Sequence, residues 1–92
     1  MKHSLPHDVE KYAESPLFTE QTVPDKLLSD HDIKPGVWAR ICVSAGVLQY
    51  IVPGDPDRVL TIQAGGHAIV EPEQVHFVKP VGQVEFKVEF YR

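Results

Sequence analysis

After Pro35 the sequence consists of six short runs of strand-forming residues, separated by residues that turn the chain. The runs span residues 37–43, 47–52, 58–63, 67–71, 75–79 and 84–91. Gly, Pro, Ser and Asp are frequent in the separators, as in the connections between antiparallel strands. No ten-residue stretch among them has apolar residues at helical spacing, so helices between parallel strands are not expected. We therefore predict an all-β fold, an antiparallel sandwich or barrel.

The last run has the clearest strand pattern. Successive side chains of a strand point to opposite faces, and here apolar residues alternate with polar ones. The apolar set is Val84, Phe86, Val88 and Phe90, and the other set is Glu85, Lys87, Glu89 and Tyr91. One face of this strand is therefore expected to be buried and the other to be polar.

Residues 1–32 are polar, contain Pro6, Pro16 and Pro24, and show no sustained strand or helix period. We predict an extended N-terminal arm with short strands that covers an edge of the sheet, and a brief helical turn after Pro24. The 92 residues are expected to form a single domain, with residues 1–32 as the arm and residues 33–92 as the barrel. A domain of this size gains stability by pairing with a second copy, so a homodimer is expected.

Composition excludes several classes of partner. The 13 acidic and 9 basic residues are scattered and give a net charge of -4, so no basic stripe for nucleic acid is expected. Cys42 is the single cysteine, which excludes an internal disulfide and a site with several cysteine ligands. No N-terminal apolar signal and no run of roughly 18 apolar residues is present, which predicts a cytoplasmic protein that does not enter a membrane.

Two segments carry candidate binding residues. In residues 66–76 a glycine turn and a strand lead to Pro72 and then to His76, where the next run begins. This order resembles the second sequence motif of cupins, in which a proline turn directs a histidine into the barrel. Residues 31–41 correspond in position to the first cupin motif, but they offer one histidine, His31, and no glutamate. A site with three histidines and a glutamate is therefore not expected.

Taken together, the stretches DHDIKPGVWARI, SAGVLQY, IVEPEQVHFV and KVEFYR resemble the TehB/YeaR-like cupin family, small domains associated with tellurite resistance and stress responses. The resemblance implies a cupin-like β-barrel or jelly-roll. It also implies that His31, His76 and Glu89 are candidate ligands of a divalent metal. Arg40 is then a candidate for orienting an anionic ligand. Trp38, which is in phase with Arg40 along the strand, either lines that ligand or belongs to the core.

The alternation in the last run leaves the place of Glu89 open. If the phenylalanines pack between the sheets, Glu89 faces outward as a solvated carboxylate. If the arm covers the outer face and the lumen is partly polar, Glu89 points inward and can bind metal. Two imidazoles and one carboxylate leave open coordination positions, a set compatible with zinc, iron(II) or manganese.

Three functions are compatible with these residues. The first is a metal- or small-molecule-binding module that acts as a sensor in a tellurite or oxidative stress response. The second is a metal-dependent enzyme in which an open coordination position activates water or oxygen on a small anionic substrate. The third is a structural dimerisation domain. The sequence leaves open whether the chain is catalytic, but no Gly-x-Gly-x-x-Gly element is present, so methyl transfer by an S-adenosylmethionine-dependent domain is not expected.

Overall fold

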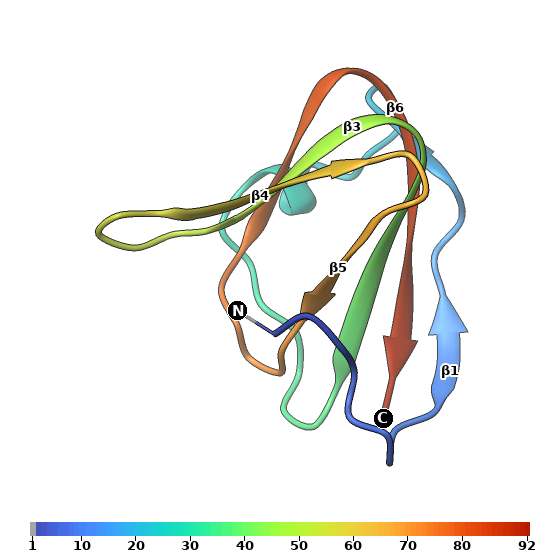
Figure 1. Ribbon diagram of the computed structural model, residues 1–92, viewed down its shortest axis with the longest axis vertical. Coiled ribbons are helices and arrows are strands. Elements are labelled where there is room, and N and C mark those ends of the chain that lie inside the picture. The colour runs from blue at the N-terminus through green and yellow to red at the C-terminus, as the bar shows by residue number, and fades with distance from the viewer. Residues whose placement is uncertain (1) are drawn as a thin grey trace.

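The protein is built almost entirely of strands. The computed structural model describes residues 2–92 (Figure 1). In chain order the elements are β1 (Lys11–Glu14), β2 (Phe18–Thr19), the 3-10 helix η1 (Asp25–Leu28), β3 (Trp38–Val52), β4 (Arg58–Gln63), β5 (His67–Val70) and β6 (Phe77–Tyr91). The brief helical turn predicted after Pro24 is present as η1. In this part of the chain no helix is long and apolar enough to cross a membrane.

The two long strands β3 and β6 form the centre of one antiparallel sheet. On the edge of β3 that faces away from β6, β5 pairs with residues 39–42 and β4 pairs with residues 47–52. On the far edge of β6, β2 pairs with residues 85–86 and β1 with residues 89–91. The all-β, antiparallel prediction is confirmed. The order β1-β6-β3-β4 is open in residues 2–92, because no strand pairing there joins β1 to β4, so a closed barrel or jelly-roll is not confirmed.

Two of the predicted turns are wrong, because residues 44–46 and 80–82 lie inside continuous strands. The pairing of β3 with β6 shifts register between Val43 and Ala45 and again between Gly46 and Val47, which makes these residues β-bulges. Gly46 has a φ of 75°, and a Cβ there would collide with the backbone carbonyl of Gln83. Glycine therefore lets the two backbones approach closely, and both strands curve across this point (Figure 1).

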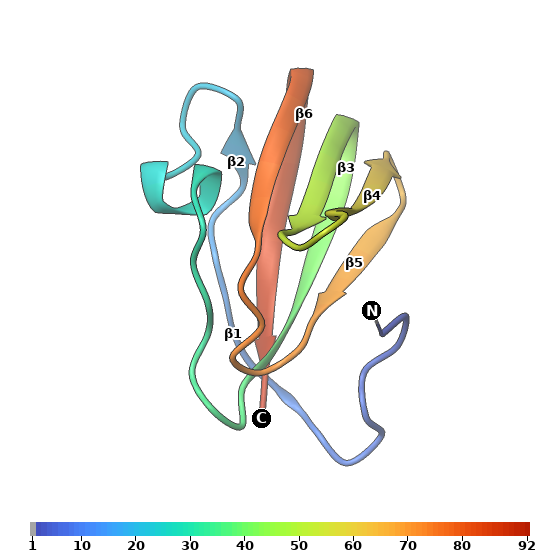
Figure 2. The same ribbon diagram turned by 90° about the vertical axis from the view of Figure 1, so that its left-hand side faces the viewer.

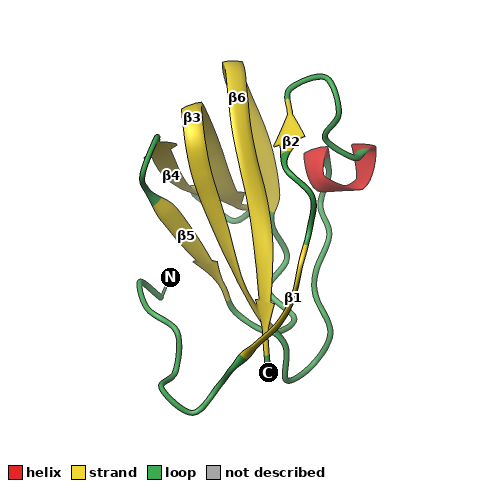
Figure 3. Ribbon diagram, turned by 90° about the vertical axis from the view of Figure 1, so that its right-hand side faces the viewer, coloured by secondary structure: helices red, strands yellow, loops and turns green. Residues whose placement is uncertain are grey.

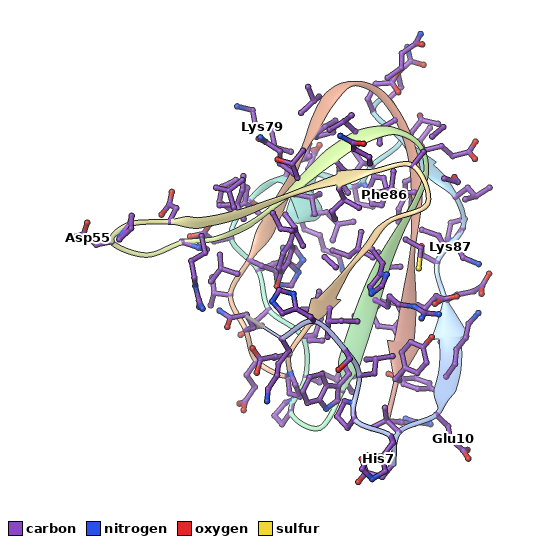
Figure 4. The ribbon with its side chains drawn as sticks, viewed as in Figure 1. His7, Glu10, Asp55, Lys79, Phe86 and Lys87 are labelled. Carbon is purple, nitrogen blue, oxygen red and sulfur yellow. The ribbon has the colours of Figure 1, made fainter. Side chains whose placement is uncertain are left out.

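The concave side of the curved sheet carries the core. Buried residues from the centre of the sheet are Ala39, Ile41, Val43, Val84, Phe86 and Val88. The arm covers this side with Phe18, Val23 and Leu27, and Ile33, which follows the arm, packs against the same core. Figures 2 and 3 show this segment, with η1, running alongside the sheet. Figure 4 marks two neighbours on β6: Phe86 lies in the interior, and Lys87 lies toward the outer side.

Candidate functional site

A short backbone bridge joins the arm to the loop before β6. His31 donates its N–H to the carbonyl of His76 at 3.0 Å, and the N–H of His76 donates to the carbonyl of His31 at 2.8 Å. The loop is held nearby by a further bond, from the N–H of Glu73 to the carbonyl of Ile33 at 3.0 Å. Glu73 has a φ of 61°, and this turn after Pro72 brings the chain back against the arm.

The bridge places the two imidazole rings against each other. Their centroids are 4.0 Å apart with an angle of 57° between the planes. The ring of Tyr50 also lies near His76, at a centroid distance of 5.3 Å. His76 is only 3% exposed, whereas His31 is half-buried. The structure therefore brings together two residues that lie in separate segments of the sequence.

Hydrogen bonds fix which nitrogen of each ring carries the proton. Nδ1 of His31 is 3.0 Å from the carbonyl oxygen of Ser29, and Nδ1 of His76 is 2.8 Å from that of Gln74. A carbonyl oxygen only accepts, so each Nδ1 donates, and in the neutral form of either ring the lone pair is on Nε2. Within residues 2–92 neither Nε2 has a hydrogen-bond partner. Both lone pairs are available to a molecule or ion placed beside the rings.

Burial keeps the His76 ring neutral. Loss of water lowers its pKa to about 4, and the nearby His31 acts in the same direction. The hydrogen bond to Gln74 and the carboxylate of Asp32 raise the pKa, but they do not compensate for burial. At neutral pH His76 is therefore an acceptor rather than a cation.

Both rings line an apolar cavity between the sheet and the arm. Its volume is about 220 Å³. Most of the wall is hydrocarbon: Phe18, Pro24, Leu27, Ile33, Ala39, Ile41, Val70, Val78, Phe86, Val88 and Phe90. Ser15, Lys26 and Asp32 are the other polar residues of the lining. A mostly apolar cavity with a few convergent polar groups is the usual form of a small-molecule site.

Glu89 lies on the opposite face of β6, away from this cavity. Its side chain is 8% exposed and accepts from Arg40, whose Nη2 lies 2.8 Å and Nε 2.9 Å from Oε1. Nζ of Lys11 is 3.1 Å from Oε2, and the hydroxyl of Tyr91 donates to Oε1 at 3.0 Å. Burial raises the pKa of Glu89, but the donors Arg40, Lys11 and Tyr91 outweigh it and lower the pKa to about 2. The carboxylate is a paired anion on the outer face.

The predicted site residues thus separate into two groups. His31 and His76 lie at the cavity, whereas Glu89 and Arg40 form an ion pair on the other face of the sheet. Trp38 shares the face of Arg40, because it precedes that residue by two positions on β3. In residues 2–92 no three His, Cys, Asp or Glu side chains are grouped to hold a metal ion.

Sequence reasoning missed several residues around both groups. Asp32 and Lys26 of the cavity lie in the polar arm, where no periodic pattern marks them. Lys11 reaches Glu89 from β1, and nothing in the local sequence indicates that contact. Tyr91 could have been found, since it is two residues from Glu89 on one strand and therefore shares its face.

The chain is similar to proteins of known sequence and structure. Residues 13–88 match the model of the TehB-like domain. The protein YeaR of Escherichia coli (strain K12) is 29% identical over 86 residues, which cover 84% of this chain and 72% of YeaR. A crystal structure of a protein from E. coli (strain K12) has a TM-score of 0.89 at 28% identity, covering 97% of this chain and 95% of that one. TehB from Haemophilus influenzae has the same fold, with a TM-score of 0.84 at 24% identity over 92% of this chain but 32% of TehB.

Proposed function

Because the chain belongs to the TehB-like domain family, we propose that it is a small-molecule-binding module whose site is the cavity between the sheet and the arm. One observation carries this proposal: the buried ring of His76 presents an Nε2 without a partner in residues 2–92, beside an apolar cavity of about 220 Å³. Residues 2–92 contain no fully enclosed side-chain nitrogen or oxygen without a partner, so this Nε2 is accessible to a water-sized probe and can accept a hydrogen bond from a ligand.

A sensor role in a tellurite or oxidative stress response suits this arrangement. The cavity has the sheet as one wall and the arm as the other. A ligand between them contacts both parts, so its binding free energy depends on where the arm lies. The arm is then the element through which binding is reported to a partner or to another domain.

A metal centre at the same histidines is the second candidate. Metal-binding histidines commonly donate their second ring N–H to a carbonyl, which orients the ring and supports the ligating nitrogen, and both rings do so here. Glu89 lies on the other face of the sheet from the two histidines, so this candidate has the two imidazoles as its protein ligands. Imidazole donors without a carboxylate favour zinc or iron(II) over manganese. The metal would supply further coordination positions facing the cavity.

The enzyme alternative needs a residue that holds an anionic substrate, and Arg40 was predicted for this role. Arg40 contacts Glu89 through two of its nitrogens and lies on the face away from the cavity. Among the described lining residues, Lys26 is the lysine or arginine that could hold an anion, but it is exposed.

Cavity binding is tested by NMR titration of the ¹⁵N-labelled protein with phenol and 1-butanol. We expect saturable shift changes of amides around Ile41, Val78 and Phe86. Ala39→Leu, which fills the cavity from a buried position, is expected to abolish them. Ala45→Leu, an exposed position on the same strand, is the control and is expected to leave them intact. Shift changes that persist unchanged in Ala39→Leu contradict the proposed site.

The metal candidate is tested on tag-free protein by elemental analysis and zinc titration. A metal held by the two rings is lost in His76→Ala and retained in Glu89→Gln. A metal held by all three predicted ligands is lost in both. Absence of a stoichiometric ion, together with no zinc binding at micromolar concentration, removes the metal candidate and leaves the cavity proposal standing.

A further inference from the structure

The cavity has room for one compact organic molecule. An apolar cavity of about 150 Å³ is enough to hold benzene. The volume here is about 220 Å³, so a six-membered ring or a short aliphatic chain fits together with one polar substituent. The apolar wall supplies the binding free energy for the body of such a molecule, and the polar lining decides which substituent is accepted.

The two histidines and Ser15 offer acceptors to the cavity. Each imidazole uses its Nδ1–H on a carbonyl, so in the neutral ring the lone pair is on Nε2. Ser15 has no spare hydrogen, because its hydroxyl donates to the carbonyl of Pro16 at 2.8 Å and accepts from the N–H of Val88 at 2.9 Å. Asp32 is a further acceptor and Lys26 a donor, and both belong to exposed residues of the lining.

We propose that this cavity selects small neutral molecules that carry a hydrogen-bond donor on an apolar body, such as phenols and alcohols, and rejects the matching carboxylates. This inference rests on the proposed function and names its ligand class. A hydroxyl satisfies an imidazole lone pair while its apolar body fills the wall. A carboxylate meets acceptors at both neutral imidazoles and at Ser15, and an unpaired buried charge is costly. A site whose buried groups all accept hydrogen bonds binds a donor and strongly rejects a ligand that offers only acceptors.

The inference differs from the sequence prediction of an anionic ligand. That prediction depended on Arg40, and the guanidinium is occupied by Glu89 on the other face. It also differs from the metal candidate, because a metal ion at the two Nε2 atoms consumes the lone pairs and attracts anions.

The test compares matched probes on protein dialysed against EDTA. Dissociation constants for phenol, benzene and benzoate, and for 1-butanol and butyrate, are measured by NMR titration at pH 7.5. We expect phenol to bind about tenfold more tightly than benzene, the worth of one net hydrogen bond. Benzoate and butyrate are expected to cause no saturable shift at concentrations that saturate with phenol and 1-butanol.

Variants assign the preference to the histidines. In His76→Phe the ratio of benzene to phenol dissociation constants is expected to fall to about twofold or less, as one hydrogen bond is lost. His31→Phe, at a half-buried position that tolerates change more readily, is expected to reduce the ratio as well. The control His67→Phe makes the same change at an exposed position of β5 and is expected to leave the ratio unchanged.

Each outcome bears on a different claim. Equal affinity for phenol and benzene, or tighter binding of benzoate than of phenol, overturns the donor preference while cavity binding stands. Binding of benzoate only after zinc is added overturns it in favour of the metal centre. No binding by any probe overturns the proposed function and this inference with it.

Discussion

Glu89→Gln should destabilise the protein strongly at neutral pH and much less in acid. The substitution keeps the shape of the side chain but mimics its protonated form, so it removes the charge that Arg40 and Lys11 contact. The folded-state pKa of about 2 lies roughly 2.5 units below the ordinary value of 4.5, which corresponds to about 3 kcal/mol at 1.36 kcal/mol per unit. The carboxylate is 8% exposed, but Lys11 and Arg40 are 39% and 37% exposed, so water screens these pairs and about 3 kcal/mol is an upper limit.

The sign of the pH dependence follows from the lowered pKa. The folded protein binds the proton less readily than the unfolded chain, so the contribution of Glu89 is complete above its ordinary pKa. It is lost as the pH falls from about 5 through 2, and less than half remains at pH 3. The stability difference between wild type and Glu89→Gln should shrink in the same window.

Urea unfolding followed by circular dichroism at pH 7 and pH 3 measures both quantities. Glu85→Gln is the matched control, because Glu85 lies on the same face of β6 and its carboxylate bonds the exposed Ser44 hydroxyl at 2.8 Å. We expect a change within about 0.5 kcal/mol for this control. The reasoning is refuted if Glu89→Gln behaves like Glu85→Gln at pH 7, or if its effect is as large at pH 3 as at pH 7.

Three further changes test the bulge, the core and the buried histidine. Gly46→Ala should lower the unfolding free energy by about 2 kcal/mol or more beyond the loss in Gly82→Ala, as measured by urea unfolding. Both glycines have a positive φ, which costs an alanine about 1–2 kcal/mol, but of these two only Gly46 is packed against the backbone of Gln83. Equal losses in the two variants contradict the close approach. Phe86→Ala, at a fully buried site, should lower the unfolding free energy by about 3–5 kcal/mol, and a loss below about 1 kcal/mol shows that the site is not core. In metal-free protein, His76 binds a proton more readily in the unfolded chain than in the folded one. The unfolding free energy should therefore fall by up to about 3 kcal/mol as the pH drops from about 6.5 to 4. In His76→Gln this contribution to the pH dependence of the unfolding free energy should be absent.

The strand pattern of the sequence predicted much of the sheet because it is a local property. The run 58–63 coincides with β4, and the alternation through 84–90 places Val84, Phe86 and Val88 in the core. The same alternation decides the place of Glu89 once the arm is known to cover the phenylalanine side. The continuity of β3 and β6 could not be predicted, because Ser-Ala-Gly and Pro-Val-Gly suit a turn as well as a bulge. Which of the two forms depends on the facing strand, here on Gly46 meeting residues 83–84.

The candidate site was predictable only in part, for a related reason. A proline turn before His76 is a local signal, and so is its place at the start of a strand. The contact with His31 is made through the arm, which has no periodic pattern to fix its path. The tautomers of both rings depend on the carbonyls of Ser29 and Gln74, and sequence cannot position carbonyls. The donors and acceptors from which a ligand class is proposed therefore depend on the folded geometry.

The pair His31 and His76 and the group around Glu89 lie on opposite faces of the sheet, but each group attaches the arm to the sheet. Lys11 and β1 hold the first part of the arm to β6, and the bridge between His31 and His76 holds its last part. Residues 15–30, which carry much of the outer wall, are fixed at both ends. Because this wall is already held in place, a ligand has to order little of the chain when it binds. The loss of conformational entropy on binding is therefore smaller. Within residues 2–92 η1 makes no backbone pairing with the sheet, so this part of the wall is less constrained than its two ends. Substitutions at Glu89 that loosen the first attachment should thus weaken binding at a cavity that Glu89 does not touch.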